Sequence, residues 1–438
     1  LPANPISPEY KNEVWRPENE FVFPLSLLTD IKRARNDEGF PLGEEYVRVL
    51  NPDDPLLSHK VRIRGNPNAG FVKVAMVGVR NPQGGETSPL NTEVWINELR
   101  LTGLDERGGM AALGRVDAQL ADFGTLTFAG NISTIGFGAL DQKVQQRQRE
   151  QITGYDIAAN FELGKFLPDR WGIRLPFYTQ YSKTVRRPEF DPYDLDVELN
   201  DKIDDADTQE QKDSIRNLSQ DIATIKSYTL TNVGKNRTTN RAPRPWDVEN
   251  FSASYAYTES DRSDPIIEFD NEKRHTASLD YAYSKTPNYV QPLKNLKGKY
   301  LQLLSQFNFN PLPNAFTFST LMDRRLATTR YRFTGLDDRF NTFFNKSFLW
   351  ERNYNLQWDL TKSLKFTFNA VNASVIDEPD ETEIRNDLDI EDPVQFRRDS
   401  IWHNITQFGR TKNYLHNFQV TYNLPLRLLP ILDWVQVD

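Results

Sequence analysis

Apolar and polar residues alternate with a period of two along several stretches of this chain. Between residues 126 and 132, Leu126, Phe128 and Ile132 share one side of an extended chain, and Thr127 and Asn131 share the other. Successive side chains of a β-strand point to opposite faces of a sheet. The pattern therefore predicts strands that have one apolar face and one polar face.

The same alternation recurs, with aromatic residues on the apolar side, at Phe251 and at Leu364. It predicts an all-β chain built from long antiparallel strands. The expected strands are 110–120, 125–134, 152–162, 173–183, 250–258, 274–285, 302–309, 316–333, 342–360, 364–376, 413–424 and 433 onward.

The connections between these strands are of two kinds. Tight turns are expected at 121–124, 164–172, 310–315 and 361–363, and long polar loops at 135–151, 184–249 and 377–412. Short turns on one side and long loops on the other are typical of outer-membrane β-barrels. Residues 105–438 are therefore predicted to contribute about 12 strands to a large antiparallel transmembrane barrel.

Strand length favours a membrane barrel over a soluble β-sandwich core, which is the alternative explanation of the aromatic residues. Several runs reach the about 9–11 residues of a tilted transmembrane strand, whereas the commonest strands in globular proteins have about 5–6. Thr127, Asn131, Thr367 and Asn369 are expected to line a polar lumen. The residues expected to face lipid or to form its aromatic girdle are Phe177, Tyr181, Tyr255, Tyr257, Tyr281, Tyr283, Phe316, Phe318, Trp358, Phe366, Phe368, Phe418 and Tyr422.

Residues 1–104 contain more proline and shorter alternating runs. Two runs, 71–79 and 92–101, predict neighbouring strands of a β-sandwich module. Trp95 in the second run is expected to pack in a core or an interface.

One insertion is predicted to be helical. Ile215, Leu218, Ile222 and Ile225 recur at helical spacing within the loop 184–249. They predict a helix over residues 204–226, outside the barrel wall or over its mouth.

The composition supports the barrel and excludes several classes of protein. Hydrophobic residues make up 38% of the 438 residues and aromatic residues 12%. A barrel with a polar lumen reconciles a low hydrophobic content with many aromatic residues. The net charge of −8 argues against nucleic acid as a partner. There is no cysteine, and no apolar run approaches the ~20 residues of a membrane helix.

No catalytic, cofactor-binding or metal site is predicted, and the chain is not expected to be an enzyme. The four histidines, His59, His275, His403 and His416, lack metal-type spacing. The acidic segment 377–392 lacks the glycine and the final glutamate of an EF-hand loop. Nucleophile-elbow and phosphate-loop motifs are also missing from the sequence.

The segment from Val94 to Gly109 resembles a signature of the SprA (also called Sov) family. Further similar stretches are 116–124, 171–177, 213–218 and 426–430, so the resemblance covers roughly residue 90 to the end. The signature residues are Trp95, Asn97, Glu98, Arg100, Gly103, Asp105, Glu106, Arg107 and Gly108.

The resemblance implies an outer-membrane translocon of the type 9 secretion system in a diderm, Bacteroidetes-like bacterium. Members of that family form a single very large barrel that exports folded cargo proteins, and in gliding species they also serve motility. The implied partners are outer-membrane lipid, secreted cargo, accessory proteins of plug, cap or lipoprotein type, and the remainder of the same large polypeptide. The start at Leu1 and the strand-like end at Asp438 lead us to expect an internal piece of such a protein.

Two other functions remain open from the sequence. One is a secreted β-sandwich module that binds carbohydrate or a partner in adhesion. The other is a nutrient-uptake barrel in the outer membrane.

Overall fold

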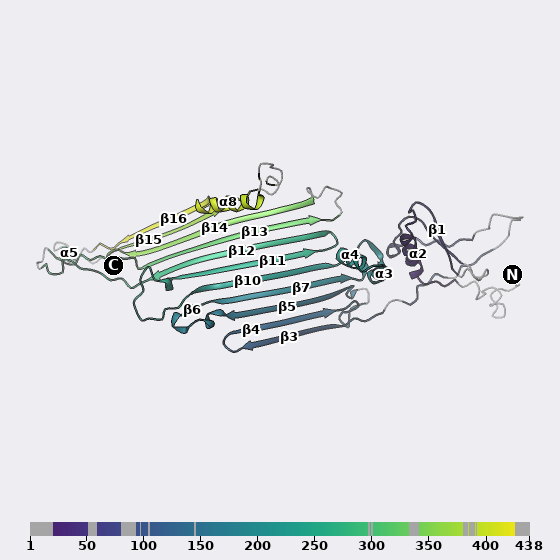
Figure 1. Cartoon of the computed structure of the whole chain (residues 1–438), viewed down its shortest axis with the longest axis horizontal. Helices are drawn as coiled ribbons and strands as arrows, with labels where there is room; N and C mark the ends of the chain where they lie inside the picture. The colour runs from purple at the N-terminus through teal and green to yellow at the C-terminus, as the bar shows by residue number, and fades with distance from the viewer. Residues whose placement is uncertain are drawn as a thin grey trace. The chain divides into compact units, whose positions relative to one another are not determined.

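The chain forms two compact units, which Figure 1 shows as ribbons. The smaller comprises Leu1–Glu106 and Pro188–Ser219, and the larger Arg107–Arg187 and Gln220–Asp438. The computed structural model describes residues 21–50, 59–79, 93–96, 98–103, 106–143, 146–296, 298, 301–332, 341–379, 384, 390 and 392–424.

The larger unit is dominated by one antiparallel sheet of 12 strands, ordered β16-β15-β14-β13-β12-β11-β10-β7-β5-β4-β3, with β6 paired to β10. Its strands are β3 (Ala111–Leu120), β4 (Gly124–Ser133), β5 (Glu150–Glu162), β6 (Ile173–Arg174), β7 (Pro176–Pro188), β10 (Asp221–Lys235), β11 (Phe251–Ser263), β12 (Ile267–Ser284), β13 (Ala315–Tyr331), β14 (Thr342–Asp359), β15 (Leu364–Val375) and β16 (Arg410–Tyr422). Short helices in its connections are η5 (Leu163–Phe166), η6 (Asp169–Trp171), η7 (Val248–Asn250), α5 (Gln302–Ser305) and α8 (Pro393–Thr406).

Short side chains close the tight hairpins of this sheet. Asp264 accepts hydrogen bonds from the backbone N–H groups of Ile266 and Ile267 between β11 and β12. Thr361 does the same for Ser363 and Leu364 between β14 and β15. Such local acceptors favour a turn over continued pairing and so fix the register of the flanking strands.

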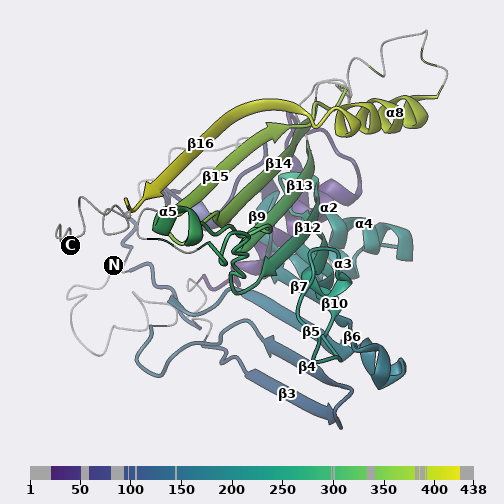
Figure 2. The ribbon, with the colours of Figure 1, turned by 90° about the vertical axis from the view of Figure 1, so that its left-hand side faces the viewer.

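The prediction of a mainly β chain with a large antiparallel sheet is confirmed, but the described residues do not close into a barrel. The strand order begins with β16 and ends with β3, and these two edge strands do not pair with each other. The sheet instead twists and curves between them, as Figure 2 shows.

Two predictions about connections are wrong. The helix predicted over 204–226 ends at Ser219, and the chain enters β10 at Asp221. The strand predicted at 302–309 contains α5. The long loop predicted at 377–412 does connect β15 to β16, and it contains α8. The turns at 121–124 and 361–363 leave one end of the sheet and the loops at 135–151 and 377–412 the other, but the tight turn at Asp264 shares the end of the long loops.

The smaller unit combines the N-terminal segment with the insertion between β7 and β10. Its elements are α2 (Ser26–Asp37), β1 (Tyr46–Val49), β2 (Lys60–Ile63), η3 (Ala69–Phe71), β8 (Phe190–Asp191), β9 (Asp194–Glu198), α3 (Leu199–Asp204) and α4 (Gln209–Ser219). Its buried apolar side chains come from both segments and are Ile31, Ile63, Val197, Leu199 and Ile203.

Ion pairs join the two segments of this unit. Lys32 of α2 is buried, and its ammonium lies 2.8 Å from carboxylate oxygens of both Asp194 and Asp196. Asp196 also accepts a hydrogen bond from the backbone N–H of Ala69. The buried charge of Lys32 is therefore matched by carboxylates that the insertion supplies.

The described residues of 1–104 do not contain the two stacked sheets of the predicted β-sandwich. They contain α2 and the two-stranded sheet of β1 and β2. Residues 72–79 and the described part of 93–101 are in no strand, and Trp95 is 49% exposed instead of packed. The middle of this stretch, 80–92, and the strand predicted from residue 433 lie outside the described residues.

Candidate functional site

The 12-stranded sheet has two chemically different faces. Residues directly opposite each other in an antiparallel ladder point to the same side, so the pairing register assigns every strand residue to a face. One row on the first side, which we call the apolar face, consists of Phe251, Tyr281, Phe318, Tyr354, Ala370 and His416. The opposite side is called the polar face.

All of the residues predicted to share an apolar side lie on the apolar face. Tyr181 stacks on Tyr155 at 5.9 Å between ring centroids, which relates β7 to β5. The remaining assignments follow from the ladders that connect β7 to β16. The residues are Phe177, Tyr181, Tyr255, Tyr257, Tyr281, Tyr283, Phe316, Phe318, Trp358, Phe366, Phe368, Phe418 and Tyr422.

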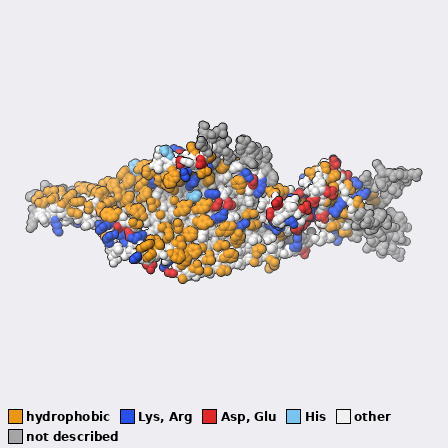
Figure 3. Space-filling model, viewed as in Figure 1, with side chains coloured by type: hydrophobic (Ala, Val, Ile, Leu, Met, Phe, Trp, Pro, Cys, Tyr) orange, Lys and Arg blue, Asp and Glu red, His pale blue; other side chains and the backbone are white. Residues whose placement is uncertain are grey.

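Aromatic side chains on this face contact one another across strands. Ring centroids are 4.9 Å apart for Phe251 and Tyr281, and 4.7 Å apart for Phe368 and Phe418. Even so, Phe418 is 58% exposed. Figure 3 shows hydrophobic side chains spread over much of the visible face of the sheet. Contiguous apolar surface of this kind marks contact with a membrane or another apolar partner.

The apolar face has a boundary along the strands. On β11, Tyr257 is followed on the same face by Glu259, whose carboxylate lies 3.6 Å from the Lys226 ammonium and 3.5 Å from that of Lys273. On β13, Met322 is followed by Arg324. The apolar residues therefore form a band, and charged rows continue beyond it.

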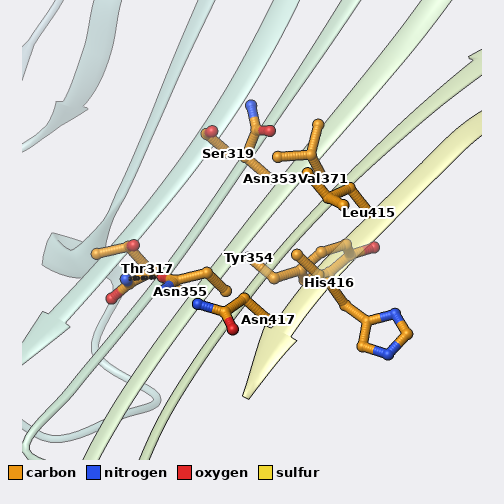
Figure 4. A pocket seen from close by; sticks show the side chains of 11 residues that line it. Thr317, Ser319, Asn353, Tyr354, Asn355, Val371, Leu415, His416 and Asn417 are labelled. Atoms are coloured by element: carbon orange, nitrogen blue, oxygen red, sulfur yellow. Dashed lines mark hydrogen bonds between the residues drawn. The ribbon is translucent and has the colours of Figure 1, made fainter. Parts of the chain in front are cut away.

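Over β13 to β16 the polar face carries mainly hydroxyl and carboxamide groups, with Val371 and Leu415 as exposed apolar residues among them. Thr317, Asn355, Asn369 and Asn417 form one row across four strands. The Asn355 side chain donates a hydrogen bond to the Asn369 side chain. These residues border a shallow hollow of about 300 Å³, shown in Figure 4.

The residues predicted to be polar-facing all lie on this side. Thr367 and Asn369 alternate with Phe366 and Phe368 along β15. Thr127 and Asn131 lie on the corresponding side of β4. The face continues from β5 to β7, because Gln180 donates a 2.7 Å hydrogen bond to Asp156.

Beyond the apolar band, the sheet carries charges on both sides. On the polar face, Arg274 donates two hydrogen bonds of 2.8 and 3.0 Å to Asp323. Arg325 likewise binds Glu272 at 2.8 and 2.7 Å. Charge on both faces is suited to water on both faces, in contrast to the band.

A buried cation that sequence reasoning missed lies within the band. Arg352 donates hydrogen bonds to Asn372 (2.8 Å), Ser374 (2.6 Å) and the carbonyl of Phe408 (3.1 Å). Its guanidinium lies 4.6 Å from the Trp350 ring centroid. The loop after β15 thus folds back over the apolar face. The sequence did carry a signal for this residue, because Arg352 is a charged position between Trp350 and Tyr354 in the apolar alternation of β14.

The described signature residues do not form a site of their own. Trp95 donates a 2.6 Å hydrogen bond to Glu93, and Arg100 binds Glu98 at 2.7 Å, with all of these side chains exposed. Gly103 has a φ of 65°, which glycine adopts without strain. Asn97 and Asp105 lie outside the described residues. Glu106, Arg107 and Gly108 lead into the first strand of the sheet.

The described residues contain no group of three or more His, Cys, Asp or Glu side chains that could hold a metal ion. The histidines make separate contacts: His275 hydrogen-bonds Tyr255 at 2.9 Å, and His403 hydrogen-bonds Gln407 at 3.0 Å. In the same part of the chain, no helix has the length and apolar character needed to cross a membrane.

Comparisons with known proteins identify the family of the N-terminal part of the chain. No curated protein matches it. Among solved structures, LpxR from Salmonella typhimurium is similar at 12% sequence identity and a TM-score of 0.17, covering 72% of this chain and 88% of that one. A TM-score so low carries no argument about fold or function. A family model described as a motility-related or secretion protein, SprA_N, matches residues 3–203. This match agrees with the signature at residues 94–109, and residues 3–203 therefore belong to the SprA (Sov) family of motility-related and secretion proteins.

Proposed function

We propose that this chain forms a section of the wall of a protein-conducting pore in the outer membrane of a Bacteroidetes-like bacterium. The pore exports folded cargo by type 9 secretion, and in gliding species it also serves motility. One observation carries the proposal: the register places a mainly apolar surface and a mainly polar surface on opposite sides of a single sheet. A wall between lipid and water requires this arrangement.

The dimensions of the apolar band support contact with lipid. On β14 the band runs from Trp350 to Trp358. This agrees with the about 9–11 residues that a tilted strand needs to cross a bilayer. Tryptophan and tyrosine are common at the margins of a membrane, where one part of the side chain meets water.

The polar face supports a conduit that does not bind its cargo tightly. Near Asn355 and Asn369 it offers uncharged hydroxyl and carboxamide groups that water satisfies. A folded cargo protein would meet no charged side chain in this row, although the exposed Val371 and Leu415 lie beside it. In this proposal the chain makes and breaks no covalent bond and needs no cofactor.

Among the described strands, β3 and β16 lie at the edges of the sheet, and these edges point to further partners. An unpaired strand edge in hydrocarbon leaves N–H and C=O groups unsatisfied, at a cost of several kcal/mol each. Strands from the rest of a larger polypeptide would pair with β3 and β16. Accessory proteins of plug, cap or lipoprotein type would then bind the loops and not the wall.

Single-cysteine labelling tests the proposal, because this chain has no cysteine of its own and any cysteine elsewhere in the full-length protein can first be replaced by serine. The full-length protein in outer membranes would carry Asn355→Cys on the polar face or Leu356→Cys on the apolar face. A membrane-impermeant maleimide should label the Asn355→Cys variant and spare the Leu356→Cys variant. Nitroxide-labelled lipids should quench only a probe at position 356. Equal labelling of the two variants would contradict the wall.

A photo-crosslinking residue at Asn369 tests conduction separately. During secretion it should capture cargo proteins, and the same residue at Phe368 should not. If the labelling results support the wall but no cargo is crosslinked at Asn369, the sheet is not the lining of a cargo conduit.

A further inference from the structure

Helix α8 packs on the apolar face of the sheet. Ile401 and Ile405 lie against the buried side chains of Phe348, Trp350 and Ile376. Asp392 caps the helix by accepting hydrogen bonds at 2.9 and 3.1 Å from the next backbone N–H groups, with a proline at the first turn. The helix is therefore a defined element seated on the sheet.

Packing against the sheet leaves large apolar side chains of α8 uncovered. Val394 is 75% exposed, Phe396 44% and Trp402 60%. A helix on a water-soluble protein normally turns such side chains toward the core. The outer surface of α8 is thus suited to a partly apolar surrounding.

The position of α8 along the strands indicates which partly apolar environment its outer surface meets. In the register, Trp350 pairs with Met322, and Phe348 pairs with Arg324, the first charged residue that β13 places on this face. Helix α8 therefore lies where the apolar band gives way to charged rows. In a sheet that crosses a bilayer, this transition falls in the headgroup region, where tryptophan is enriched.

Basic side chains of α8 suit the same location. Arg398 is one helical turn before Trp402, so the two share a side of the helix. Its contact with Asp399, at 3.7 Å, joins two side chains that are 66% and 62% exposed. An ion pair so exposed contributes little, and a phosphate group can replace it.

A polar anchor fixes the loop beneath this surface. Arg352 holds the Phe408 carbonyl just after α8, and Asn404 donates a 2.8 Å hydrogen bond to the carbonyl of Asp377. Asp377 also binds Arg410 through two hydrogen bonds of 2.9 and 2.8 Å. Both ends of the loop are thereby tied to the sheet, which keeps α8 at one height along the strands.

We propose that α8 is an interfacial helix that binds the lipid headgroup layer beside the sheet. Phe396 and Trp402 insert among headgroups and upper acyl chains, and Arg398 contacts lipid phosphate. This inference rests on the proposed function, since lipid must cover the apolar face for a headgroup layer to lie there. A protein partner that covers α8 is the rival occupant, and the test distinguishes it.

Fluorescent probes on single cysteines provide the test. The full-length protein carrying Trp402→Cys, Phe418→Cys or Asp141→Cys would be labelled with an environment-sensitive dye. It would be reconstituted alone into vesicles of phosphatidylethanolamine and phosphatidylglycerol. We expect a blue-shifted probe at 402 that headgroup-nitroxide lipids quench more than acyl-chain-nitroxide lipids do. The probe at 418 should respond to acyl-chain nitroxide, and the probe at 141, in the loop after β4, to neither.

The pattern of failures separates the two proposals. Quenching at 418 without quenching at 402 would overturn the interfacial helix but not the pore wall. This is the result expected if a protein partner covers α8 instead of lipid. A lack of quenching at both positions would overturn the wall itself. Arg398→Glu should reduce quenching at 402, whereas Arg398→Lys should retain it; an unchanged response to Arg398→Glu would exclude the phosphate contact.

Discussion

Phe368 and Asn369 are consecutive residues of β15 whose side chains lie on opposite faces of the sheet. Phe368 lies opposite Phe418, with ring centroids 4.7 Å apart, on the apolar face. Asn369 accepts a hydrogen bond from Asn355 on the polar face. Neighbouring positions in one strand therefore report on two different environments.

Charge on the apolar side of β15 should prevent assembly. Phe366→Arg combined with Phe368→Arg places two cations where lipid is proposed, at a cost of about 2–4 kcal/mol for each near the bilayer centre. Folding can be followed by the heat-dependent shift in gel mobility, and secretion by cargo in the medium. Thr367→Lys with Asn369→Lys in the same strand should leave both nearly unchanged. Equal tolerance of the two double variants would argue against the face assignment.

Loss of the buried arginine should release the loop that carries α8. Arg352→Met removes hydrogen bonds to Asn372, Ser374 and Phe408, and we expect a destabilisation of about 1.5–3 kcal/mol. Limited proteolysis should then cut within residues 393–406 more rapidly. Arg325→Met is the matched control, because its pair with Glu272 is partly exposed and should contribute at most about 1 kcal/mol. Similar protease resistance in both variants would refute the anchor.

The glycine after α8 should resist substitution. Gly409 has a φ of 68°, and an added Cβ would lie 2.8 Å from both the Ile376 side chain and the Val375 carbonyl oxygen. We expect Gly409→Ala to cost at least about 1–2 kcal/mol, because the left-handed conformation is unfavourable with a Cβ. Gly114→Ala in β3, with nothing within 4 Å of the new Cβ, is the control. Thermal unfolding of the two variants compares them.

Acid should weaken the smaller unit. Burial raises the pKa of Asp196, but hydrogen bonds from Lys32 and the Ala69 N–H, together with the Lys32 charge, outweigh it and lower the pKa below its ordinary value. A carboxylate with a lowered pKa stabilises the folded state above the ordinary pKa of about 3.9, and this contribution is lost as the pH falls further. The protection of α2 against hydrogen exchange should decrease on acidification below pH 4. Asp196→Asn should flatten that response.

Alkali should weaken the same ion pair by deprotonating Lys32. Burial lowers the pKa of Lys32, but the hydrogen bonds and charges of Asp194 and Asp196 raise it above its ordinary value overall. Its stabilising contribution is complete below the ordinary pKa of about 10.4 and is lost as the pH rises through the higher folded value. Exchange protection in α2 that is constant between pH 9 and 12 would contradict this ion pair.

The faces of the sheet were predictable because a period of two is visible in a single strand. The segment 364–370 alone separates Phe366 and Phe368 from Thr367 and Asn369, and the ladders only extend that separation. The error at residues 204–226 has a specific cause. Ile222 and Ile225 match helical spacing, yet in β10 they lie on opposite faces, among β-branched residues that favour a strand.

Other features depend on contacts that no local pattern reveals. The start of α8 had a readable signal, since Asp392 followed by Pro393 is a favourable helix beginning. Nothing near Arg352 in the sequence indicates Ser374 or Phe408 as its partners. Nor does any local pattern indicate that α2 is completed by residues of a distant insertion and not by its own neighbours.

That distant insertion has a consequence for biogenesis. Lys32 and Asp196 are separated by 164 positions, so a growing chain presents α2 long before the acidic groups that neutralise it are made. The N-terminal segment cannot make these contacts until β3, β4, β5 and β7 have been synthesised. The smaller unit can therefore be completed only after the chain has passed β7, but already before or during the synthesis of β10.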